Sequence, residues 1–135
     1  MKVKAEELEI KDTVTRVFAN WSSMRPEAND VLYFADDQTV LYDVSPMQDL
    51  GWSVQKSRLN ILFAGFSEFW IKPNADLCVH CCGEMAWVTA TWKAHIKLNE
   101  GTELIHAGRS TFVLQRKDDR WLVVHDHVSV PIEAN

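Results

Sequence analysis

The chain lacks the features that mark several large classes of protein. Only three of its 135 residues are cysteines, and this odd count suits a reducing compartment better than a disulfide framework. No apolar run approaches the roughly 20 residues of a membrane span, and the first seven residues lack the apolar stretch of a signal peptide. The formal net charge is -5 and Lys and Arg do not cluster. We therefore expect a cytoplasmic protein that binds neither nucleic acid nor a membrane.

Motifs for several kinds of cofactor and nucleophile chemistry are also missing. The sequence contains no Gly-rich phosphate loop, no dinucleotide fingerprint and no Gly-x-Ser-x-Gly. Cys78, His80, Cys81 and Cys82 superficially suggest a metal site. Along a strand, however, Cys81 faces away from the other three, and no second ligand pair with zinc spacing is present. We expect no metal and no cofactor, and we interpret these cysteines as small packed hydrophobic residues.

Large aromatic side chains, by contrast, are plentiful. The chain has six tryptophans and six phenylalanines, and 47% of its residues are hydrophobic. Such side chains supply the contact area of a core and also suit an apolar cavity. The sequence has no linker, internal repeat or low-complexity segment. It therefore predicts one domain over residues 1–135, which would bury roughly two-thirds of the surface of the unfolded chain.

The hydrophobic pattern changes its period about halfway along the chain. The first half predicts an amphipathic helix, a short helix from Pro26 towards Phe34, a strand over 39–43 and a second amphipathic helix from Trp52 to about Gly65. The second half has period 2 and predicts long antiparallel strands, the first of them distorted at Pro73. Helices followed by such strands make an α+β fold. The first helix is indicated by Ile10, Val14, Val17, Phe18 and Trp21, and the extended runs are 69–82, 85–98, 102–117 and 120–131.

Short motifs spread over nearly the whole chain carry a family resemblance. They are Leu41-Tyr42-Asp43, Gly51-Trp52, Ala86-Trp87-Val88 with Trp92, 108–114, Asp119-Arg120-Trp121 and 125–131. In this order they resemble the nuclear transport factor 2-like superfamily, above all its SnoaL-like and ketosteroid-isomerase-like branch. The last segment is also similar to the association domain of calcium/calmodulin-dependent kinases.

The resemblance implies a cone-shaped barrel. A strongly curved antiparallel sheet would carry the N-terminal helices over its concave face and enclose a pocket between them. The fold alone specifies no reaction, because isomerases, cyclases, dehydratases, epoxide hydrolases and non-catalytic modules share it.

The segment 120–131 holds the most informative polar residues. Strand alternation places His125 and His127 on one face and Asp126 on the other. In the kinase association domain the equivalent of Val128 faces the cavity. In that register Leu122, Val124, Asp126 and Val128 would line the cavity, and both histidines would lie on the outer face. A bulge or a one-residue slip would reverse the assignment.

Three residues are the first candidates for catalysis. A carboxylate on an apolar wall has a raised pKa, so Asp126 is the candidate general base. Tyr42 is a candidate hydrogen-bond donor to a carbonyl or enolate oxygen, and Asp43 a candidate acid or base. His125 and His127 are the alternative catalytic candidates. Structural explanations compete with these roles, because a neighbouring side chain can satisfy Asp126 and Asp43 can cap a turn.

The pocket is expected to be apolar. The kinase association domain has arginines at three cavity positions where this chain has Trp92, Phe112 and Val128, which favours an uncharged ligand. The predicted ligand-binding residues are Trp92, Trp21, Phe18, Phe63, Phe66, Phe112 and Val128.

Two functions remain open from the sequence. The first is binding of a small, largely apolar molecule, with cofactor-free acid-base chemistry of the isomerase, cyclase, dehydratase or epoxide-hydrolase type. The second is a non-catalytic ligand-binding or assembly module. Under either function we expect a homodimer through the outer sheet face, because a monomer rarely leaves a contiguous apolar patch exposed to solvent. The interface residues predicted for it are Trp121, Val123, His125, His127 and Val113.

Overall fold

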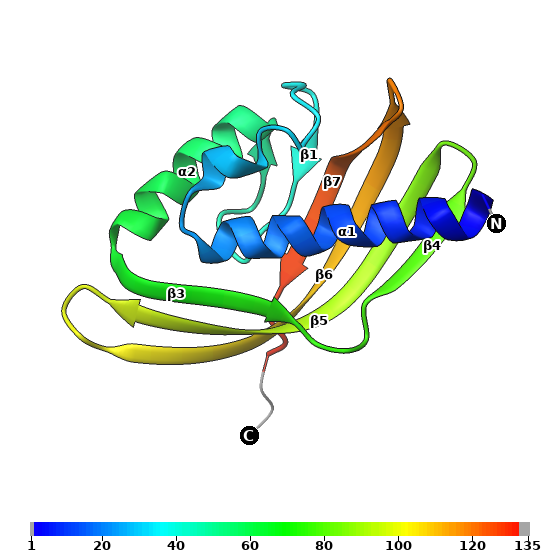
Figure 1. Cartoon of the computed structure of the whole chain (residues 1–135). Coiled ribbons are helices and arrows are strands. Elements are labelled where there is room, and N and C mark those ends of the chain that lie inside the picture. The colour runs from blue at the N-terminus through cyan, green and yellow to red at the C-terminus, as the bar shows by residue number, and fades with distance from the viewer. Residues whose placement is uncertain (1, 133–135) are drawn as a thin grey trace.

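The computed structural model describes the backbone of residues 2–132 and the side chains of residues 4–132. It has an α+β fold in which helices lie over a curved antiparallel sheet, as predicted (Figure 1). Neither of its α-helices combines the length and the apolarity that a membrane crossing needs. The elements are α1 (Lys2–Ser22), the 3-10 helix η1 (Pro26–Asn29), β1 (Val40–Leu41), β2 (Asp49–Leu50), α2 (Trp52–Ala64), β3 (Phe66–Pro73), β4 (Cys78–Cys82), β5 (Met85–Leu98), β6 (Glu103–Lys117) and β7 (Arg120–Ser129).

The sheet is built around one long hairpin. β5 and β6 pair antiparallel over almost their whole length, and β7 follows on the far side of β6. The extended run 69–82 is divided, because β3 ends at Pro73 and β4 begins at Cys78, and both strands pair with β5. The sheet therefore runs β3-β5-β6-β7 with β4 beside β5, curved but open.

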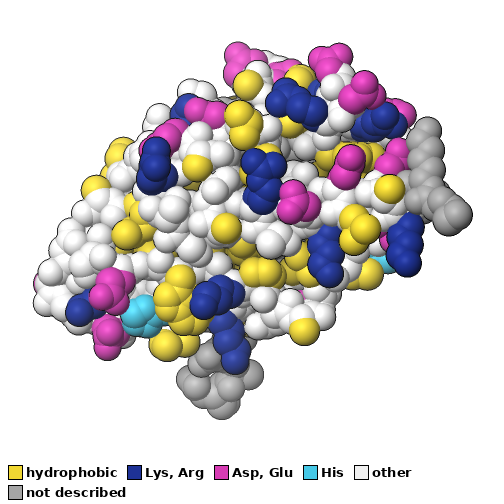
Figure 2. Space-filling view, viewed as in Figure 1, with side chains coloured by type: hydrophobic (Ala, Val, Ile, Leu, Met, Phe, Trp, Pro, Cys, Tyr) yellow, Lys and Arg dark blue, Asp and Glu magenta, His cyan; other side chains and the backbone are white. Residues whose placement is uncertain are grey.

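α1 crosses the concave face of this sheet (Figure 1). The five apolar residues at helical spacing are all buried, which confirms the predicted core face of this helix. Its end is fixed to β3 by one side chain: Ser22 Oγ donates to the carbonyl of Ile71 at 3.0 Å and accepts from its N–H at 2.9 Å. Over the α1 side of the molecule, acidic and basic side chains alternate with small apolar areas (Figure 2).

α2 packs against η1, β2 and β3. Gly51 precedes it with φ of 90°, and a Cβ there would lie 2.9 Å from the Cα of Asp37, so only glycine fits without strain. Trp52 in its first turn stacks on Tyr33, with ring centroids 4.2 Å apart. The segment that was predicted as a helix from Pro26 to Phe34 forms only the single turn η1, and the chain then extends to bridge β7 at Tyr33.

A β-bulge divides β7 into two parts. Val113 pairs with His125, and the next residue of β6, Leu114, pairs with Val123. Val124 is therefore an additional residue in β7, and the strand changes face across it.

The bulge corrects part of the predicted register. Beyond it, Asp126 and Val128 point inward and His127 is exposed, as expected. Before it, Trp121 and Val123 belong to the hydrophobic core, with 4% and 0% of their surface exposed. Their predicted place on the outer face is wrong, because the bulge reverses the alternation. For the same reason Val124 does not share the face of Asp126.

Candidate functional site

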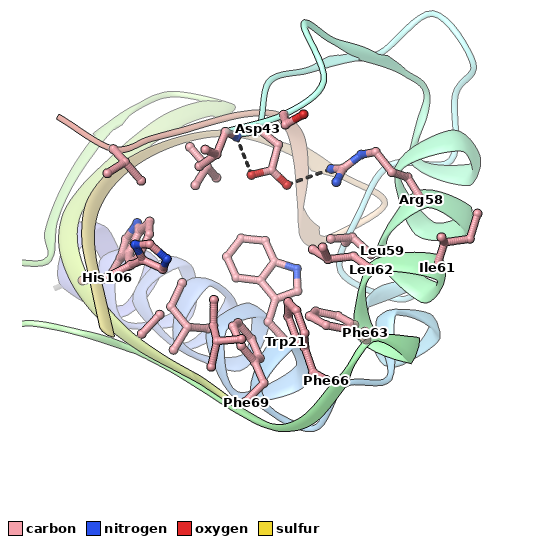
Figure 3. Close-up of a pocket in the computed structure, with 18 of the residues that line it drawn as sticks. Trp21, Asp43, Arg58, Leu59, Ile61, Leu62, Phe63, Phe66, Phe69 and His106 are labelled. Carbon is pink, nitrogen blue, oxygen red and sulfur yellow. Dashed lines mark hydrogen bonds and ion pairs between the residues drawn. The ribbon is translucent and has the colours of Figure 1, made fainter. Parts of the chain in front are cut away.

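A pocket of about 640 Å³ lies between α2 and the concave face of the sheet (Figure 3). The turn after β1 forms its rim. Most of its lining is aliphatic or aromatic, and its volume lies in the range of small-molecule sites. It is lined by Trp21, Asp43, Val44, Ser45, Pro46, Arg58, Leu59, Ile61, Leu62, Phe63, Phe66, Phe69, Ile71, Trp92, Ala94, Ile96, His106, Val128 and Val130.

Aromatic rings form one wall and the floor. Phe63 at the end of α2 packs against Phe66 and Phe69 of β3, with ring centroids 5.9 and 5.2 Å apart. Trp92 lies on the sheet side, where its indole N–H donates to Ser110 Oγ at 2.9 Å. The Trp92 ring occupies the space above Gly108, where a Cβ would lie 2.2 Å from it. This wall is therefore set by strand pairing rather than by a mobile loop.

An ion-pair cluster forms the polar end of the pocket. Arg58 of α2 donates from Nη2 to Asp43 Oδ2 at 2.7 Å and to Asp49 Oδ2 at 2.9 Å, and its Nε binds both oxygens of Asp49. Asp43 Oδ1 accepts the backbone N–H of Val44 at 2.7 Å. Asp49 is almost fully buried, whereas Asp43 reaches the pocket. Arg58 thus fixes a carboxylate on the pocket wall.

The charge on Arg58 is well stabilised. Burial lowers the pKa of its guanidinium, but the hydrogen bonds and charges of Asp49 and Asp43 outweigh this effect and raise the pKa above its ordinary value. The group therefore stays charged at every pH at which the protein works.

His106 of β6 lies on the pocket wall across from the ion-pair cluster (Figure 3). It pairs with Ala94 of β5 in the ladder and so has the same inward parity as Gly108 and Ser110. The ring nitrogens of an imidazole can accept or donate a hydrogen bond. The pocket thus offers a carboxylate and an imidazole from two different elements.

Trp21 adds a third polar group. Its side chain extends from α1 into the space between Asp43 and the aromatic wall (Figure 3). Only 7% of its surface is exposed, and its indole Nε1 is buried without a hydrogen-bond partner among the described residues. Buried donors are normally paired, so a ligand oxygen that reached this N–H would make a hydrogen bond that the fold leaves unmade.

Asp126 lies behind the pocket wall. It is fully buried and absent from the pocket lining, and its Oδ2 accepts the hydroxyl of Tyr33 at 2.6 Å. Burial is the main cause that raises its pKa to about 7; the Tyr33 hydrogen bond opposes this shift, and the charges of Asp43 and Asp49 add to it. The raised pKa agrees with the sequence prediction for a carboxylate among apolar groups. A direct role for Asp126 as base stays a prediction.

Tyr42 and the two histidines of β7 lie together on the other face. The Tyr42 ring packs edge-on against His125 and His127, with centroid distances of 5.3 Å to each. His125 Nδ1 lies 2.6 Å from the carbonyl oxygen of Val40. These three side chains are absent from the pocket lining. The structure therefore brings Asp43, but neither Tyr42 nor Asp126, to the pocket.

The predicted ligand-binding residues divide into two groups. Trp21, Trp92, Phe63, Phe66 and Val128 line the pocket. The other two, Phe18 and Phe112, are fully buried behind Trp21, and their rings are 5.7 Å apart. They pack behind the pocket wall and do not line the pocket itself.

Neither Arg58 nor His106 was predicted to line the pocket. A signal for His106 was present, because it shares strand parity with Phe112, which was expected in the cavity. Arg58 carried no such signal, since a helical arginine is normally solvated.

Comparisons with known proteins agree with this architecture. The sequence profile of a family described as the SnoaL-like domain matches residues 14–133. A solved structure of a nuclear transport factor 2-like superfamily protein from Salmonella enterica has a TM-score of 0.90 and 20% identity, covering 98% of this chain and 96% of that chain.

Two further solved structures are similar at lower identity. A protein from Novosphingobium aromaticivorans, provisionally named a scytalone dehydratase, has a TM-score of 0.83 and 14% identity, covering 95% of this chain and 85% of that chain. A protein from Xanthomonas campestris, provisionally named a calcium/calmodulin-dependent protein kinase II association domain, has a TM-score of 0.77 and 18% identity, covering 93% and 88%. No curated protein matches the chain. At these identities the likeness shows the fold.

Proposed function

The chain belongs to the SnoaL-like domain family, and we propose that it binds a small, largely apolar molecule in the pocket and performs acid-base chemistry on it. The reaction class would be that of an isomerase, cyclase, dehydratase or epoxide hydrolase. One observation carries the proposal: a carboxylate, Asp43, is fixed by Arg58 on the wall of an otherwise apolar pocket. Two of the similar structures are provisionally named dehydratases, which fits this class.

In this proposal Asp43 exchanges a proton with the ligand. Its two oxygens are held by Arg58 and by the N–H of Val44, so the carboxylate cannot rotate away from the pocket. His106 on the opposite wall supplies the second proton-transfer group, and the indole N–H of Trp21 supplies a donor for a developing negative charge.

The test is the activity of Asp43→Asn on a panel of ketones, epoxides and hydroxy compounds. The variant keeps the shape of the side chain, and Arg58 keeps its pairing with Asp49. Loss of a general base should lower kcat/KM by roughly 100-fold or more. Asp37→Asn, on the exposed turn outside the pocket lining, is the matched control. Full activity of Asp43→Asn would remove Asp43 as the base.

The second candidate function is a module that binds or assembles without catalysis. The observation that favours it is a row of two histidines, a tryptophan and a valine on the outer sheet face, formed across four strands by His80, Trp87, Val113 and His125. Trp87 is 45% exposed and stacks on His80, with centroids 4.7 Å apart. We propose that a second copy of the chain covers this row, since a two-fold axis would place each row against itself.

The location of the protein is also a proposal. Cys78, Cys81 and Cys82 are all free thiols, and two of them are exposed. Exposed free thiols persist where thiols are kept reduced, which supports a cytoplasmic location.

A further inference from the structure

The polar end of the pocket carries more negative than positive charge. Asp43 and Asp49 both bind the single guanidinium of Arg58, so two carboxylates and one cation leave one net negative charge. Among the described residues that line the pocket, Arg58 is the sole lysine or arginine. The surrounding walls are apolar, so solvent screens this charge poorly. A second anion placed beside Asp43 would therefore be disfavoured.

Asp43 still has room to accept a hydrogen bond. Its Oδ1 accepts one N–H from Val44, and its Oδ2 accepts one N–H from Arg58. Each carboxylate oxygen has two acceptor positions, so one position on each oxygen remains. A hydroxyl group of a ligand fits such a position, because a hydrogen bond to a charged acceptor is strong in an apolar environment.

Trp21 would bind a hydrogen-bond acceptor of the same ligand, whereas Asp43 would bind a donor. Its indole Nε1 can only donate, the part of the chain that the structure describes offers it no partner, and its ring lies between Asp43 and the aromatic wall. Opening this contact to a ligand carbonyl or ether oxygen would satisfy the buried donor. A ligand that satisfies both groups carries one donor and one acceptor at different positions.

We infer that the ligand is a neutral, ring-containing molecule with a hydroxyl group that donates to Asp43 and a second oxygen that accepts from Trp21. A carboxylate of the same shape binds more weakly, because the negative cluster repels it. This inference rests on the proposed function, because it concerns the occupant of the same pocket. The aromatic wall of Phe63, Phe66 and Trp92 suits two fused rings.

Four naphthalene probes separate these requirements. They are 6-acetyl-2-naphthol with both oxygens, 6-ethyl-2-naphthol with the donor alone, 2-acetyl-6-methoxynaphthalene without the donor, and the anion 6-acetyl-2-naphthoate. Titration calorimetry at neutral pH should give the smallest Kd for 6-acetyl-2-naphthol. The methoxy compound and the naphthoate should each bind about 10-fold more weakly or worse.

Two variants assign the contacts to residues. Asp43→Asn removes the net charge, so the preference for hydroxyl over methoxy should fall and binding of the naphthoate should improve. Trp21→Phe keeps a ring but removes the N–H. It should therefore raise the Kd of 6-acetyl-2-naphthol and leave the Kd of 6-ethyl-2-naphthol unchanged. Trp121→Phe is the matched control, because Trp121 also has a buried N–H that no described residue pairs with, but it lies outside this pocket.

The outcomes distinguish this inference from the proposed function. Leu62→Trp fills the pocket from a half-exposed position of α2 and should abolish binding of every probe. If no probe binds, or if Leu62→Trp leaves binding intact, the pocket is not the site and both proposals fall. If probes bind in the pocket but the naphthoate or the methoxy compound binds as tightly as the naphthol, the proposed function stands and the ligand class is wrong.

Discussion

Burial separates the roles of the two aspartates that the sequence marked for chemistry. Asp43 lies on the pocket wall with a charged partner, and Asp126 lies in the core with a neutral one. A charged group without a cationic partner is costly to bury, so Asp126 is held mainly as the neutral acid below its pKa of about 7. Its bond to Tyr33 connects β7 to the residue that stacks on Trp52 of α2. We therefore expect Asp126 to position α2.

Replacement of Asp126 by Asn should change how stability depends on pH. The folded-state pKa of Asp126 is raised from 3.8 to about 7, so its proton stabilises the fold at low pH and this contribution is lost as pH rises through about 7. Asn does not titrate, so the variant does not lose this contribution. When the pH rises from 5 to 8, the difference in unfolding free energy between Asp126→Asn and wild type should therefore shift by roughly 1–3 kcal/mol in favour of the variant. Urea denaturation at both pH values measures this.

Asp118→Asn, on the exposed turn before β7, is the control for that comparison and should show no such gain. A constant difference between Asp126→Asn and wild type across the pH range would mean that Asp126 titrates alike in folded and unfolded chains. If a reaction is found, the same variant tests the direct role: a loss of activity with unchanged ligand binding would restore Asp126 as a base.

Side-chain chemistry was predictable only in part. Asp43 was a candidate because it ends a short strand before a proline loop, and this place does bring it to the pocket rim. Arg58 and Asp49 come from α2 and β2, and their meeting with Asp43 depends on how α2 packs. The local sequence pattern does not predict contacts between residues of separate elements, so this cluster could not be predicted.

At the scale of elements, periodicity predicted most of the fold. The long strand Met85–Leu98 begins and ends where the alternation does, and α2 begins at Trp52 as the sequence indicates. The bulge at Val124 escaped prediction, because an inserted strand residue leaves both halves with regular alternation. That one residue moved Trp121 and Val123 from the predicted interface into the core.

The β5-β6 ladder should be sensitive to a methyl group at Gly108. A Cβ there would lie 2.2 Å from the Trp92 ring and 2.7 Å from the carbonyl oxygen of Ser129, so either the pocket wall or β7 must shift. Gly108→Ala should lower the free energy of unfolding by about 1–3 kcal/mol and weaken probe binding. Thermal and urea denaturation measure the first effect.

Gly65→Ala is the matched control for this substitution. Gly65 has an ordinary φ of -86°, and its Cβ would meet only the carbonyl oxygen of Leu62 at 3.4 Å. It should change stability little. If the two substitutions lowered the free energy of unfolding equally, the close packing of Gly108 against Trp92 would not be the cause of the Gly108→Ala effect.

At the scale of the whole molecule, the outer sheet face predicts a dimer. Trp87→Glu places a charge in the centre of the exposed row and should yield monomers in size-exclusion chromatography with light scattering. Leu8→Glu, at an exposed position of α1, should leave the dimer intact. A wild-type chain that is already monomeric at micromolar concentration, or a Trp87→Glu variant that stays dimeric, would contradict the interface.

The central claim is that the apolar pocket with Asp43 on its wall is the working site. A crystal structure of the chain with 6-acetyl-2-naphthol tests it most directly. The account predicts the ring system between Phe63 and Trp92, with the hydroxyl oxygen within hydrogen-bonding distance of Asp43. An unoccupied pocket at saturating probe, or a probe bound only on the outer sheet face, would contradict it.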